Sequence, residues 1–198
     1  MFFNLLQTPL IFSFSSIMHK KKLGIHFLGT KMTKIYEELA LANQWTNNKL
    51  RNHLKNNNIN IYELQTPYGS VAEVVLHLID WIHNWLNRVE ISNYTLSFRT
   101  VDDYSDPQKI FLDWEKADIR YLQFIQSIQD FEKIIYYTDS EGHAQNLKLS
   151  AILLQLSHHF VNHRAHIALK LRDELNLPAP PLEIIFWFLK QSKKDNHS

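Results

Sequence analysis

The stretch at positions 158–166 reads His158-His159-Phe160-Val161-Asn162-His163-Arg164-Ala165-His166, and it lies inside an apolar run with helical spacing. His159 and His163 are separated by about one turn of an α-helix. Side chains at this spacing share a helix face, with Cβ atoms about 5–6 Å apart. Both imidazoles can therefore reach one metal ion at about 2.0–2.1 Å, and a third ligand must come from elsewhere in the chain.

The composition points to a single globular domain. Of the 198 residues, 45% are hydrophobic and 13% aromatic, which argues against disorder. The net charge of +1 provides no general attraction for nucleic acid, so we expect no nucleic-acid partner. The chain has no cysteine, which excludes disulfides and cysteine nucleophiles and leaves His, Asp and Glu as metal ligands. Four glycines and six prolines favour long helices over a strand-and-turn fold.

Residues 1–31 differ from the rest of the chain. An apolar, serine-rich stretch precedes Lys20, Lys21 and Lys22, whereas a secretory signal places its positive charges first. The apolar stretch is also interrupted, and it falls short of the roughly 18–20 apolar residues that a membrane helix needs. We therefore expect a cytoplasmic protein with no membrane partner. Residues 1–31 are interpreted as an N-terminal extension, either weakly ordered or preceding a true start at Met32.

Four long segments have apolar residues at helical intervals. Each begins at a residue suited to cap a helix. The expected caps are Thr33, Ser70, Asp106 followed by Pro107, and Ser150. The expected ends are the asparagines 56–58 for the first helix, Val89 for the second, Ile128 for the third and Leu175 for the fourth.

The connections complete the expected architecture. Residues 91–106 have the composition of a long loop, and residues 131–149 switch to an alternating pattern around a turn at 139–142. A short amphipathic segment at 182–190 precedes a polar tail, 191–198. The sequence thus predicts an all-α fold for residues 32–190. It is a four-helix bundle with a long crossover and a small β-hairpin before the last long helix.

Several motifs resemble those of the DinB-like (YfiT-like) superfamily of metal-binding four-helix proteins, which is unrelated to the DNA polymerase of similar name. They occur in the family's order: the run 42–47 on the first helix, 70–88 on the second, the hairpin 137–142, and the His-rich stretch 159–167. The sequence departs from the family pattern by Ala42 in place of tyrosine, Thr46 in place of alanine, and Ala165-His166 in place of Gly-Gln.

The resemblance implies a divalent metal ion held by His77, His159 and His163. Zinc is expected first, with nickel and iron as alternatives, because all three suit imidazole ligands. Three imidazoles leave a coordination position open for water or substrate. The expected function is therefore a metal-dependent transferase or hydrolase that activates water or a low-molecular-weight thiol for attack on a small molecule. The alternative is a non-catalytic metal-binding protein for stress response or sensing. The family also implies a homodimer.

Other residues near the histidines have open roles. Glu73 is our candidate for a catalytic base because it lies one helical turn before His77, and Asp80 lies about one turn after it. Either carboxylate could instead be solvated or paired with a cation. His166 lies on nearly the same helix face as His159 and His163. Two interpretations stay open: His166 contacts the metal site, or it lies outside it.

The remaining polar and aromatic candidates are read as structural. Arg164 points about 100° away from His163 around the helix, so helix pairing or a salt bridge is expected. Asn43 and Asn47 either line the pocket or bond across helices. The tryptophans at 45, 81, 85 and 114 are expected in the core or the pocket wall. The histidines at 19, 26, 83 and 143 have no partner at a useful spacing and are assigned to the surface.

Overall fold

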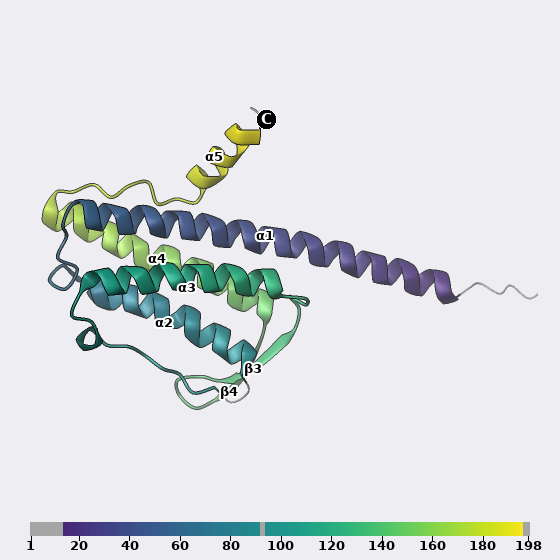
Figure 1. Ribbon diagram of the computed structural model, residues 1–198. Coiled ribbons are helices and arrows are strands. Elements are labelled where there is room, and N and C mark those ends of the chain that lie inside the picture. The colour runs from purple at the N-terminus through teal and green to yellow at the C-terminus, as the bar shows by residue number, and fades with distance from the viewer. Residues whose placement is uncertain (1–13, 92–93, 196–198) are drawn as a thin grey trace, which may run out of the picture.

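Four long helices form the bundle that the sequence predicts. The computed structural model describes the backbone of residues 14–91 and 94–195 and the side chains of residues 32–91 and 94–193. The helices are α1 (Phe14–Asn56), α2 (Val71–Glu90), α3 (Pro107–Ser127) and α4 (Leu149–Leu175). Both α1 and α2 pack against α3 and α4. In Figure 1, α2 and α3 run in one direction while α1 and α4 run in the other.

The connections follow the predicted pattern. The segment between α2 and α3 contains the short 3-10 helix η1 (Val101–Asp103) and returns along the length of the bundle (Figure 1). Strands β3 (Ile134–Thr138) and β4 (Ala144–Lys148) form the expected antiparallel hairpin before α4. A second hairpin, β1 (Gln65–Thr66) with β2 (Gly69–Ser70), was not predicted. Strands this short have no recognisable periodicity.

Two of the predicted helix caps are confirmed. The Ser70 side chain accepts a hydrogen bond from the Glu73 backbone N–H, while the Glu73 side chain accepts one from the Ser70 backbone. This reciprocal arrangement is a capping box, which satisfies two donors at the start of α2. The Asp106 side chain accepts from the Gln108 backbone N–H, and Pro107 is the first residue of α3.

The predicted cap at Ser150 is wrong, because α4 already begins at Leu149. The backbone N–H of Leu149 donates to the Lys133 carbonyl and that of Ser150 donates to the Phe131 carbonyl, each at 2.9 Å. The chain entering the hairpin thus satisfies these first-turn donors, and a side-chain cap is not needed.

The predicted start of the first helix at Thr33 is also wrong. Helix α1 begins at Phe14 and extends beyond the other three helices in Figure 1. Residues 14–31 contain no proline to interrupt a helix. Residues 1–13 of the proposed extension lie outside the described part of the chain, and the boundary at 31/32 stays a prediction. In the described ranges 14–91 and 94–195, none of the helices has the length and apolar character that crossing a membrane requires.

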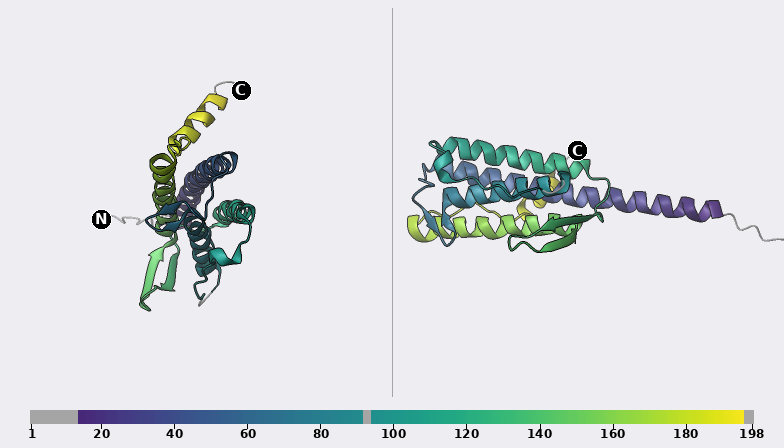
Figure 2. Two further views of the ribbon diagram at one scale, coloured as in Figure 1. Left: turned by 90° about the vertical axis from the view of Figure 1, so that its left-hand side faces the viewer. Right: turned by 90° about the horizontal axis from the view of Figure 1, so that it is seen from below.

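Helix α5 (Ile185–Asp195) replaces most of the predicted polar tail. It continues beyond the predicted amphipathic segment 182–190, and residues 196–198 lie outside the described chain. Figure 2 shows α5 standing away from the bundle axis. The loop that precedes it is anchored, since Leu177, Ala179 and Leu182 pack against the core.

A buried polar network links α1, α3 and α4. Arg164 on α4 donates from Nη1 to Asn47 Oδ1 at 2.8 Å and from Nη2 to Asn43 Oδ1 at 2.9 Å. On the other side, Asn47 Nδ2 and Arg51 Nη1 donate to the two carboxylate oxygens of Asp118 at 2.7 and 2.8 Å. All five side chains are buried. The helix-pairing role of Arg164 and the cross-helix bonding of the two asparagines are therefore confirmed.

Asp118 is the only carboxylate in this network of five, and it faces two arginines. Burial raises the pKa of Asp118 to about 6, while Arg51 and the hydrogen bond from Asn47 act in the opposite direction. The side chain is thus ionised at pH 7.5. Burial also lowers the pKa of Arg164 to about 10, which still leaves the guanidinium charged.

We expect Asp118→Ala to destabilise the fold by about 3–5 kcal/mol at pH 7.5, because it leaves buried arginine charge without its carboxylate. Urea unfolding followed by circular dichroism measures this loss. Glu115→Ala, an exposed position on the same helix, is the matched control and should change stability by less than about 0.5 kcal/mol. Equal stability of the two variants would contradict the role of Asp118.

His83 is not a surface residue as predicted. It is partly buried, and its Nδ1 lies 2.7 Å from Arg120 Nη1. Because an arginine can only donate, Nδ1 accepts this hydrogen bond. Burial, followed by the charges of Arg99 and Arg120, lowers the pKa of His83 to about 4. By contrast, His143 is exposed on the β3–β4 turn as expected, and the side chains of His19 and His26 lie outside the described set.

His83 should make the stability depend on pH. Its pKa is lower in the folded protein than the ordinary 6.5, so the unfolded chain takes up a proton that the folded chain does not. The stabilisation is present above pH 6.5 and is lost as the pH falls toward 4. We expect His83→Gln to reduce the slope of unfolding free energy against pH, between pH 6.5 and 5, by up to about 1 kcal/mol per unit. Parallel wild-type and variant curves would refute this.

Candidate metal centre

The three histidines singled out from the sequence come together between two helices. His77 lies near the middle of α2, and His159 and His163 lie on the facing side of α4. One ligand nitrogen from each of the three residues lies within 4.8 Å of the others. A single ion bound at about 2.0–2.1 Å from each nitrogen would need only small side-chain rotations.

Two of the imidazoles have a buried nitrogen with no protein partner. His159 Nε2 and His163 Nδ1 are inaccessible and make no hydrogen bond with any described residue. Buried polar atoms are normally satisfied, and one left unpaired is costly. An ion bound by these nitrogens would satisfy them, so the donor set fits a divalent metal such as zinc, nickel or iron.

The surroundings keep these imidazoles in the form that binds metal. Burial lowers the pKa of His77, and it lowers the pKa of His159 and of His163 to about 4, with smaller contributions from the neighbouring histidines. The three rings are therefore neutral at pH 7. Metal binding to imidazole requires this neutral form.

Aromatic side chains lie against the cluster. The Trp81 ring lies 5.8 Å from His77 and 5.5 Å from His159, measured between ring centroids. Tyr68, which the sequence reasoning missed, lies 5.0 Å from His163 and 4.9 Å from His166. His166 therefore contacts Tyr68, which in turn contacts His163. It is not one of the three residues whose ligand atoms come together.

The β1–β2 turn positions Tyr68. Gly69 follows it with φ +97°, and a Cβ atom there would lie 2.6 Å from Glu73 Oε2. Only glycine combines this backbone conformation with such a close approach. The Pro67-Tyr68-Gly69 run signals a turn in the sequence, but its distance in the chain from His163 hides the contact.

Glu73 and Asp80 lie near the cluster with different environments. Glu73 Oε2 accepts hydrogen bonds from the Ser70 backbone N–H at 2.6 Å and from Ser70 Oγ at 2.8 Å, and these bonds lower the pKa of Glu73. Asp80 is buried, and its carboxylate accepts from the Arg99 backbone N–H at 2.7 Å and faces Arg99 Nε at 3.3 Å. Asp80 therefore anchors the crossover loop.

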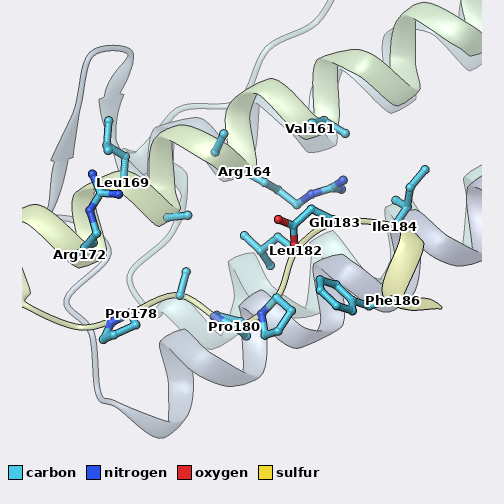
Figure 3. A pocket seen from close by; sticks show the side chains of 14 residues that line it. Val161, Arg164, Leu169, Arg172, Pro178, Pro180, Leu182, Glu183, Ile184 and Phe186 are labelled. Carbon is cyan, nitrogen blue, oxygen red and sulfur yellow. The ribbon is translucent and has the colours of Figure 1, made fainter. Parts of the chain in front are cut away.

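A cavity of about 640 Å³ opens beside the cluster. Its walls come from α2, α4, the β1–β2 turn and the crossover loop, and they include His77, His163, Glu73 and Tyr68. A separate cavity of about 760 Å³ lies between α4 and the segment leading to α5 (Figure 3). Its lining is mainly apolar and includes none of the three histidines. Of these two cavities, only the smaller one is lined by members of the histidine cluster.

Comparison with known proteins agrees with the fold described above. The model of the DinB family matches residues 29–174. Among solved structures, YfiT from Bacillus subtilis, described as a probable metal-dependent hydrolase with an unusual four-helix bundle topology, is similar with a TM-score of 0.52 and 19% identity. The similarity covers 72% of this chain and 88% of YfiT, and it supports the fold. No curated protein matches the chain.

We expect the purified protein to hold about one divalent ion per chain, and His159→Ala to lose it, since two imidazoles bind far more weakly than three. Elemental analysis after gel filtration measures the ratio of metal to protein. His158→Ala is the matched control, because His158 is the exposed neighbour whose Nδ1 lies 3.0 Å from the Leu154 carbonyl oxygen. Unchanged metal content in His159→Ala would reject the site.

Proposed function

This chain belongs to the DinB family, and on that premise we propose that it is a metal-dependent transferase or hydrolase acting on a small molecule. The observation that carries the proposal is the cluster of three imidazoles, two of which have a buried nitrogen with no protein partner, beside a cavity large enough for a small substrate. His77, His159 and His163 would hold the ion. A divalent metal bound there would lower the pKa of a water molecule or a thiol and so make it a nucleophile at neutral pH.

The chain supplies groups around that nucleophile. Glu73 lines the same cavity as His77 and His163, so we propose it as the acceptor of the proton released by the water or thiol. Tyr68 and Trp81 lie against the cluster and form an aromatic wall of the site. We propose a low-molecular-weight thiol as one substrate and a small electrophile as the other.

A non-catalytic role in stress response or sensing is the second candidate. It is favoured by one observation, that Glu73 Oε2 is already engaged in capping α2. In that case the ion would mainly tie α2 to α4, with no turnover.

We also propose that the protein forms a homodimer and works in the cytoplasm. Exposed apolar side chains on α4 and α5 support self-association, including Val161, Leu169, Ile185, Phe186 and Leu189. An apolar surface of this kind is typical of a protein interface.

A screen of low-molecular-weight thiols with model electrophiles and esters, with and without added zinc, tests the catalytic proposal. We expect a zinc-dependent rate that falls at least about tenfold in Glu73→Gln, within the range for loss of a general base. Ser70→Ala is the control for the cap, because it removes the Ser70 hydroxyl and leaves the Glu73 carboxylate. Absence of a rate in every combination, with zinc bound, would favour the sensing role.

A further inference from the structure

The cavity beside the histidine cluster has an unbalanced set of charges. Its lining contains three carboxylates, on Glu73, Asp80 and Asp102, and one cation, Arg99. Arg99 is already paired, with Nε 3.3 Å from Asp80 and Nη1 3.9 Å from Asp113. Among the described residues, neither Glu73 nor Asp102 takes part in an ion pair. Glu73 and Asp102 therefore have no protein counterion at the cavity, and a divalent ion on the three histidines would bring positive charge to the same cavity.

The pairing of Arg99 also disfavours anionic ligands. Asp80 is only 3% exposed and receives both the Arg99 backbone N–H and the guanidinium. An anion that recruited Arg99 would leave this buried carboxylate without its cation, and an unpaired buried charge is strongly unfavourable. Arg99 thus closes the crossover loop onto α2 and is not available as an anion-binding group.

Two exposed aromatic rings lie at the same cavity. Tyr68 is 54% exposed and Phe98 is 55% exposed, and they come from the β1–β2 turn and the crossover loop. The face of an aromatic ring attracts cations through its quadrupole. The rings and the two carboxylates that have no ion-pair partner therefore favour the same kind of ligand. Tyr68 and Glu73 come from the β1–β2 turn and the first turn of α2, whereas Phe98 and Asp102 come from the crossover loop.

We propose that this cavity selects small molecules that carry an ammonium group, with a short apolar linker to the part that reaches the histidine cluster. The part of the ligand that reaches the histidine cluster rests on the proposed function, because it requires a metal ion on the three histidines. The selection of the ammonium group depends only on Glu73, Asp102, Tyr68 and Phe98. Val74 and Leu76 supply apolar wall for the linker.

The test compares three thiols of similar size on the zinc-loaded full chain at pH 7.5 by isothermal titration calorimetry. The thiols are cysteamine (cationic), 2-mercaptoethanol (neutral) and 3-mercaptopropionate (anionic). We expect cysteamine to bind most tightly. We expect Asp102→Asn to reduce its advantage over 3-mercaptopropionate by about three- to fivefold, as for removal of one exposed charge. Comparing variant with wild type cancels the intrinsic difference in thiol acidity.

Glu115→Gln is the matched control, because it removes the same charge at an exposed site on α3 outside the cavity. Phe98→Ala tests the aromatic contribution and should also reduce the cysteamine advantage. An unchanged advantage in both Asp102→Asn and Phe98→Ala would overturn the proposal, as would a wild-type preference for 3-mercaptopropionate.

A second experiment separates this inference from the metal proposal. The metal-free protein is titrated with n-butylammonium and with butyrate while NMR follows the Trp81 indole proton, which lies beside the cluster. A shift with the ammonium and none with butyrate supports ammonium selection even if the chain fails to retain zinc. Equal responses to the two ions would reject ammonium selection while leaving the metal site intact.

Discussion

The orientation of α4 depends on the buried hydrogen bonds that Arg164 makes to Asn43 and Asn47 of α1. Neighbouring residues on a helix point about 100° apart, so fixing Arg164 toward α1 turns His163 toward a different neighbour, α2. His159 lies one turn earlier on the same face and follows it. The network that holds the bundle together therefore also aims the two imidazoles at His77. Asp118 extends the same constraint to α3 through Asn47 and Arg51.

Helix-level features were predictable from the sequence because they are local. The spacing of His159 and His163, the cap at Ser70 and the proline after Asp106 each act within one or two helical turns. The assignment of His77 as the third member needed the family resemblance, since nothing local connects α2 with α4. The failures at Thr33 and Ser150 have a common cause. A residue suited to cap a helix acts as a cap only where the helix lacks other partners for its first backbone donors.

Contacts between distant segments account for what sequence reasoning missed. Tyr68 reaches His163 across the bundle because the β1–β2 turn folds back over α4, and the Arg99 to Asp80 contact forms because the crossover loop returns along α2. His83 has no partner on its own helix, and its hydrogen bond comes from Arg120 on α3. None of these pairs has a regular spacing in the chain. The part of the cavity wall that comes from the β1–β2 turn and the crossover loop is thus a property of the connections between the helices.

The state of Glu73 links the fold to the proposed chemistry. Both hydrogen bonds from Ser70 go to Oε2, so the cap stabilises the carboxylate as an anion and lowers its pKa. A carboxylate of low pKa is a weak base, and it accepts a proton efficiently only from a group that is itself made acidic. A metal-activated water or thiol meets that condition, whereas an ordinary alcohol does not. Whether or not turnover occurs, the same cap keeps a permanent negative charge at the cavity, and that charge is what an ammonium group would meet.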